Sequence, residues 1–85
     1  MNIQTSPRPC AAGTTYTVIA SAGTAPYTYT LQPAPPNPPG LELTVVAGVA
    51  YVSVPAGAPR GAILYVEVAD SASPPSLGTS TNAVS

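Results

Sequence analysis

The sequence contains no histidine, no lysine, no phenylalanine and no tryptophan, and it has one cysteine. Without histidine and lysine it can form no Ser-His-Asp or Cys-His arrangement and no Schiff base, which removes the usual routes of nucleophilic catalysis. The single cysteine, Cys10, can neither close an intrachain disulfide nor join a cysteine cluster for zinc. These absences favour a protein that is not an enzyme.

Charge is also scarce: charged side chains make up 6% of the 85 residues, and the net charge is −1. The acidic residues Glu42, Glu67 and Asp70 predict neither a general acid–base pair nor a calcium site, which needs several carboxylates. Asp70 is expected instead to bond to the backbone of its own turn. Two arginines, Arg8 and Arg60, cannot form a basic patch for nucleic acid or an anionic membrane. We therefore expect no cofactor, metal ion, small-molecule substrate, nucleic acid or membrane as a ligand.

Long hydrophobic runs are missing as well. No stretch approaches the roughly 18 apolar residues of a membrane helix, and residues 1–9 lack the apolar segment of a secretory signal. We expect a protein that is made and kept in the cytoplasm or assembled there, or else a module cut from a larger exported protein. Proline and glycine are frequent, at 12 and 7 residues, but the regular apolar alternation argues against disorder.

What the sequence does have is alternation with a period of two. In residues 27–32, Tyr27, Tyr29 and Leu31 alternate with threonines, which is typical of a half-buried strand. Similar strands are predicted at 14–22 (Tyr16, Val18 and Ala20 inward), 41–46 (Leu41, Leu43 and Val45 inward), 49–54 (Val52 and Val54 inward), 63–69 (Leu64, Val66 and Val68 inward) and 79–85.

Turn signals separate these strands. Ala47-Gly48 predicts a two-residue hairpin turn. Residues 33–40 hold five prolines in their first seven positions, which predicts an extended, polyproline-like crossing between sheets. An alternative for that segment is a ligand for SH3 or WW domains. Cys10 is expected to be a half-buried residue near a strand start.

Six or seven short strands with turns every 8–12 residues and no helical period predict an all-β fold. We interpret residues 14–85 as an immunoglobulin-like antiparallel β-sandwich, and residues 1–13 as an N-terminal arm or edge strand. No Cys…Trp…Cys pattern is present, which excludes an antibody-type domain.

Three segments, AGTAPYTYTL at 22–31, PPGLEL at 38–43 and VEVADS at 66–71, resemble bacterial and phage immunoglobulin-like repeats that are related to cadherin-like domains. The resemblance covers residues 12–85 and implies an immunoglobulin-like sandwich fold. Such domains are inserted in or appended to many phage structural proteins. The sequence departs from the family at residues 53–57, where the family often has Gly-Thr-Pro. Only Asp70 lies near the positions that calcium-binding relatives use.

Binding through surface shape is the function that remains. Tyrosine and arginine are enriched at protein interfaces, and the candidate interface residues are Ile3, Arg8 and Tyr65. For Tyr65 the alternative is that it packs on threonines of its own sheet. The first and last strands are candidate edges to which a neighbour could add a strand.

Two functions fit these features. The first is an accessory component of a bacteriophage virion, such as a capsid decoration protein or a small tail protein, that contacts capsid or tail proteins or copies of itself. It is favoured by the Met1 start, the missing export signal, the unpaired cysteine and a single immunoglobulin-like module. The alternative is a repeat from a secreted bacterial adhesin or carbohydrate-active enzyme, which would serve as an extracellular or cell-surface spacer or adhesion module.

Overall fold

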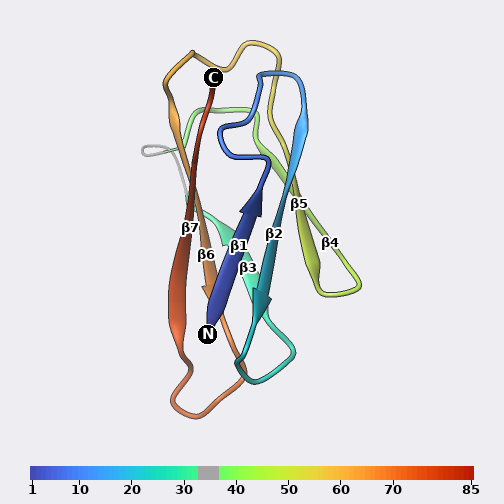
Figure 1. Cartoon of the computed structure of the whole chain (residues 1–85), viewed down its shortest axis with the longest axis vertical. Helices are drawn as coiled ribbons and strands as arrows, with labels where there is room; N and C mark the ends of the chain where they lie inside the picture. Colours follow the sequence, from blue (N-terminus) through green and yellow to red (C-terminus); the bar gives the residue numbers. More distant parts are fainter. Residues whose placement is uncertain (33–36) are drawn as a thin grey trace.

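A computed structural model describes residues 1–32 and 37–85, and within them the chain forms strands and turns but no helix (Figure 1). The strands are β1 Asn2–Ser6, β2 Thr15–Ser21, β3 Thr28–Leu31, β4 Glu42–Val46, β5 Val49–Ser53, β6 Ile63–Ala69 and β7 Leu77–Ala83. The molecule is elongated, with extents of 39 × 22 × 17 Å.

The strands form two sheets with the order β1-β2-β5-β4 and β3-β6-β7. All strand pairs within the sheets are antiparallel. When the strands are lettered A to G along the chain, this order reads A-B-E-D and C-F-G, which is the topology of a seven-stranded immunoglobulin constant-type sandwich. The predicted fold class is therefore confirmed.

The core lies between the two inner faces, and it follows the alternation of the sequence. β2, β5 and β6 contribute side chains that are fully or almost fully buried, and the predicted inward sets of these strands are confirmed. The buried hydrophobic residues are Cys10, Tyr16, Val18, Ala20, Tyr29, Ala50, Val52, Val54, Leu64, Val66, Val68 and Val84. Cys10 is completely buried rather than half-buried.

The N-terminal segment closes one corner of the sandwich. After β1 pairs with β2, the chain crosses to β7, where the Cys10 N–H donates to the Ala83 carbonyl at 2.9 Å and the Ser85 N–H donates to the Cys10 carbonyl at 2.7 Å. The Thr5 and Ser80 hydroxyls share a hydrogen bond of 2.6 Å between β1 and β7. The first and last strands thus cover each other's edges, which limits strand addition at this corner.

Two expectations need correction. Val45 was predicted to point into the core, but 47% of its surface is exposed. β4 is an edge strand of its sheet, and the β4–β5 hairpin projects beyond the body of the sandwich (Figure 1). Val45 lies two residues from the turn of this hairpin and is therefore only partly covered. The last strand begins at Leu77 and ends at Ala83, two residues earlier than predicted at each end.

Of the proline-rich segment 33–40, the structure describes the part from Asn37 onward. Residues 33–36 lie outside the described residues, and with them most of the predicted polyproline-like segment and its SH3 or WW alternative. Asn37 follows directly and is buried, with 5% of its surface exposed. Its side chain accepts a hydrogen bond from the Tyr65 N–H at 2.8 Å and donates to the carbonyls of Tyr65 and Gln32 at 3.0 and 2.8 Å. Asn37 therefore extends the β3–β6 ladder by one step.

Candidate docking surfaces

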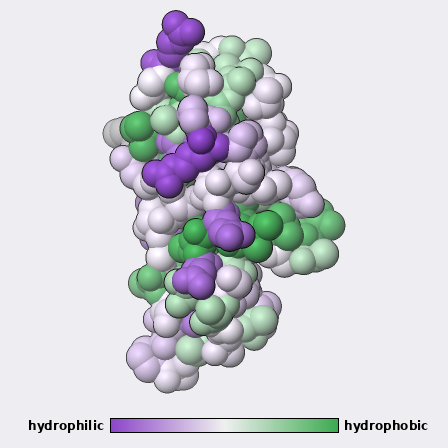
Figure 2. Space-filling model, viewed as in Figure 1, coloured by the Kyte–Doolittle hydropathy of each residue, from purple (hydrophilic) through white to green (hydrophobic). Residues whose placement is uncertain are grey.

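The outward side of the four-stranded sheet carries exposed apolar side chains at the β4–β5 hairpin, where Figure 2 shows a green band. The pairing register places Val46, Val49 and Ile19 in one row across β4, β5 and β2. Val46 exposes 55% of its surface and Ile19 exposes 40%. Clustered apolar side chains, unlike single ones, mark surfaces that a partner covers. We define the hairpin patch as Ile19, Val46, Val49 and Tyr51.

A groove of about 500 Å³ runs beside the hairpin patch. One wall is formed by the hairpin, including Val45 and Val49, and the other by the β2–β3 turn at Ala25 and Pro26. Every lining residue is apolar in its side chain except for the phenol of Tyr27. The groove therefore suits an apolar side chain of a protein partner rather than a charged ligand.

Tyr29 fixes the hairpin against β2. From β3, its hydroxyl accepts a hydrogen bond from the Ala20 N–H at 3.1 Å and donates to the Gly48 carbonyl at 2.8 Å. Ala20 lies one residue beyond the last β2–β5 pair, so the phenol takes the place of the missing strand partner. These two hydrogen bonds connect β3 of one sheet to β2 and the hairpin of the other sheet. They hold the hairpin patch in one position before any partner binds, which lowers the entropic cost of binding.

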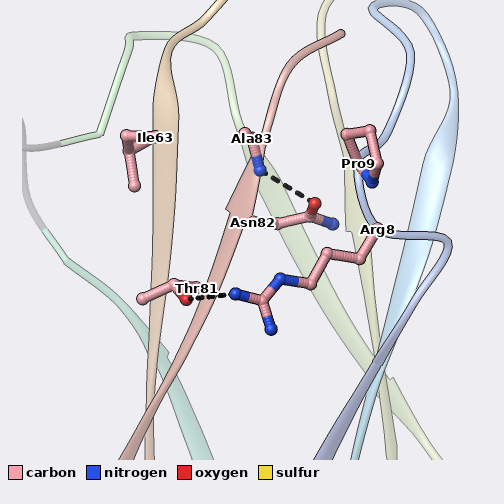
Figure 3. A pocket seen from close by; sticks show the side chains of 6 residues that line it. All are labelled: Arg8, Pro9, Ile63, Thr81, Asn82 and Ala83. Atoms are coloured by element: carbon pink, nitrogen blue, oxygen red, sulfur yellow. Dashed lines mark hydrogen bonds between the residues drawn. The ribbon is translucent and has the colours of Figure 1, made fainter.

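The outward side of the three-stranded sheet brings Arg8 and Tyr65 onto one face. Tyr65 lies opposite Thr81 in the β6–β7 pairing, and the Arg8 side chain reaches over β7 until its Nη2 is 3.5 Å from Thr81 Oγ1 (Figure 3). Glu67 is the next outward residue of β6, and its Oε2 accepts a hydrogen bond from Gln32 Nε2 at 3.0 Å. Two of the three predicted interface residues, Arg8 and Tyr65, therefore lie on the same face as the Glu67 carboxylate.

A shallow hollow of about 380 Å³ lies beside the Arg8 guanidinium. Figure 3 shows Ile63, Thr81 and Ala83 along it, with Pro9 at its rim. The hydrogen bond of the guanidinium is a long one to a neutral hydroxyl, so its remaining N–H donors are available to a carboxylate from outside.

Ile3, the third predicted interface residue, lies apart from this face. It is half-buried and packs against the core from β1. It fits closely over Gly78 of β7, since a Cβ added to that glycine would lie 2.6 Å from Ile3 Cδ1. The structure therefore places Ile3 in the β1–β7 contact within the chain.

Asp70 organises the turn after β6, as predicted. Its Oδ1 accepts hydrogen bonds from the N–H groups of Ser76 at 2.7 Å and Ala72 at 3.1 Å, and its Oδ2 accepts one from Thr24 at 3.3 Å. These donors, above all the Ser76 N–H, hold the pKa of Asp70 below its ordinary value. The carboxylate is fully engaged in joining two turns at one end of the sandwich.

The described residues contain no group of three or more histidine, cysteine, aspartate or glutamate side chains placed to hold a metal ion. In the described part of the chain there is also no helix long and apolar enough to cross a membrane.

The sequence analysis did not predict the hairpin patch, although the sequence contains one indication of it. Val45 and Val46 are adjacent, so one of them must point to each side of the strand. Whether the inward one is buried depends on the width of the opposing sheet, which the sequence pattern of β4 does not contain.

Comparison with known proteins gave no match: no family model, no curated protein and no solved structure matches this chain.

Proposed function

We propose that this chain is a non-enzymatic structural module that docks onto another protein through its hairpin patch, as an accessory component of a bacteriophage particle. The observation that carries the proposal is the outward row of Val46, Val49 and Ile19, in which Val46 and Ile19 are exposed and Val49 is half-buried, on a hairpin fixed by Tyr29. A nearly uncharged exterior and an immunoglobulin-like topology support it, because both suit a subunit that neighbours cover.

Binding of the chain to purified particles that lack it is the direct test of this proposal. Purified particles are mixed with the isolated chain, and the bound copies are counted by mass spectrometry. We expect saturable binding of the wild type. Val46→Glu places a charge in the middle of the hairpin patch and is expected to weaken binding at least tenfold, because an unpaired buried charge costs more than about 1.4 kcal/mol.

Thr15→Glu is the matched control. Thr15 is exposed on β2, on the outward side of the same sheet but at the end remote from the hairpin. It receives the same charge and should bind like the wild type. If the chain is missing from particles, or if both variants bind equally well, the proposal is wrong.

One observation favours the alternative of a spacer repeat in a secreted adhesin or enzyme. The chain enters the sandwich low in the view of Figure 1 and leaves it at the top, because β1 and β7 run in the same direction along the long axis. Modules with this arrangement can be joined end to end. A tandem dimer linked from Ser85 to Met1 should then be a rod about twice as long as one module by small-angle X-ray scattering, and it should not bind particles.

A further inference from the structure

The face formed by β6 and β7 carries side-chain charges of both signs. Arg8 lies beside Thr81 at one edge of this face, and Glu67 lies on β6 opposite Thr79. Of the other charged residues, Arg60 lies in the β5–β6 loop and Glu42 on the opposite sheet, while Asp70 is bonded within its turns. We define the β6–β7 face as Arg8, Tyr65, Glu67, Thr79 and Thr81, a set separate from the hairpin patch.

The pairing register gives the layout of this face. Tyr65 and Thr81 form one row and Glu67 and Thr79 form the next, about 7 Å further along the strands. The guanidinium and the carboxylate are therefore offset diagonally across this face, and the half-buried Tyr65 lies in the same row as Thr81. The remaining members of the β6–β7 face are threonines, which present no bulky obstacle.

Such a layout is self-complementary. A two-fold axis that lies in the plane of contact and crosses the line from Arg8 to Glu67 at its midpoint and at a right angle places Arg8 of each copy over Glu67 of the other. Because a two-fold contact is isologous, one such match produces two equal ion pairs. We propose that the β6–β7 face is a contact between two copies of this chain, with the Arg8 guanidinium of each copy on the Glu67 carboxylate of the other.

Two further observations point to a second copy as the occupant. The large apolar side chains at the two ends of the same sheet, Ile63 and Leu77, expose 43% and 67% of their surface, and a facing copy would cover both. The net charge of −1 per chain causes little repulsion between copies. The hollow beside Arg8, with Ile63 and Thr81 on its floor, gives the incoming carboxylate room to approach.

Charge reversal tests the contact. Sedimentation equilibrium of the full chain at low salt, up to about 1 mM, should show a reversible dimer that weakens as salt is added. Arg8→Glu alone and Glu67→Arg alone should each raise the dissociation constant at least tenfold, because each substitution turns two attractive pairs into two like-charge pairs. The double variant R8E/E67R should return to within about threefold of the wild type, since it restores both pairs in reverse.

Controls remove the effect of net charge. Arg60→Glu and Glu42→Arg make the same charge changes away from the face and should leave the dissociation constant unchanged. The mismatched double variant R60E/E67R has the net charge of R8E/E67R but should stay as weak as E67R. All these side chains are exposed, and melting curves should confirm that each variant is folded.

Three results would overturn the inference: a wild type that stays monomeric over the whole range, a double variant no tighter than the single ones, or controls that weaken association equally. The hairpin patch is tested separately, because Val46→Glu should leave this dimer intact. Failure of particle binding and failure of self-association can therefore be told apart.

Discussion

At the scale of single residues, Tyr16 and Tyr29 present the same side chain to the core in two different states. Both rings are buried, but the Tyr29 hydroxyl makes two hydrogen bonds, whereas the Tyr16 hydroxyl has no hydrogen-bond partner among the described residues. Burial raises the pKa of Tyr16 to about 12, with a smaller contribution from the nearby Cys10. The two phenols therefore contribute to stability with opposite sign.

Replacing each tyrosine by phenylalanine separates these contributions. Tyr29→Phe leaves the Ala20 N–H and the Gly48 carbonyl without their partner, and it should lower the free energy of unfolding by about 2 kcal/mol. Tyr16→Phe removes a buried hydroxyl that has no partner, and it should leave the free energy of unfolding unchanged or raise it by about 1 kcal/mol. Urea unfolding followed by circular dichroism measures both, and a loss of more than about 1 kcal/mol for Tyr16→Phe would contradict the assignment.

At the scale of elements, the β4–β5 hairpin has a turn that its residues fit imperfectly. Ala47 and Gly48 both have positive φ, 52° and 79°. This conformation is that of a type I′ turn, whose right-handed twist matches the strands. Glycine adopts it freely, but an alanine with positive φ is strained by about 1 kcal/mol.

The strain at Ala47 can be relieved or increased without touching the core, because its side chain is exposed. Ala47→Asn should raise the free energy of unfolding by about 1 kcal/mol, since asparagine is the preferred residue at the first turn position. Ala47→Val should lower it by a similar amount, because a β-branched side chain tolerates positive φ poorly. Thermal melts measure both variants. Equal effects in the same direction would show that the backbone conformation at Ala47 does not control the stability of the hairpin.

The elements that the sequence predicts best are those buried on one side along their whole length. β2 and β6 follow the period-two pattern from end to end because a sheet covers their inner face throughout. The pattern is wrong at Val45, which is exposed near the tip of the projecting β4–β5 hairpin (Figure 1). Asn37 is buried through hydrogen bonds to the backbone of a strand 28 residues away, a contact that no local pattern encodes.

The candidate surfaces also depend on contacts that no local pattern encodes. Alternation places Tyr65 on the outside, but only the crossing of the N-terminal segment onto β7 brings Arg8 to the same face.

At the scale of the whole molecule, the scarcity of ionisable groups determines how stability responds to pH. Histidine and lysine are absent, so neither residue type titrates in the folded or the unfolded state. Asp70 controls the acidic side, because the Ser76, Ala72 and Thr24 N–H groups hold its pKa below the ordinary 3.8. Tyr16 and Cys10 act on the alkaline side, where burial raises the pKa of both groups. Stability should therefore form a broad plateau between these two limits.

The sign on each side follows from linkage. Asp70 has a lowered pKa in the folded state, so its contribution is complete above the ordinary value of 3.8 and is lost as the pH falls below it. Tyr16 has a raised pKa, so its contribution is complete below the ordinary 10.0 and is lost as the pH rises through about 12. We expect the free energy of unfolding, measured in urea at each pH, to stay level from about pH 5 to 9 and to decline on both sides.

Two variants assign these declines to single residues. Asp70→Asn should flatten the decline of the unfolding free energy in acid and leave the decline in alkali unchanged. Tyr16→Phe should reduce the alkaline decline alone, with the remainder due to Cys10. An acidic decline of unchanged slope in the Asp70→Asn variant would show that another carboxyl group controls unfolding in acid.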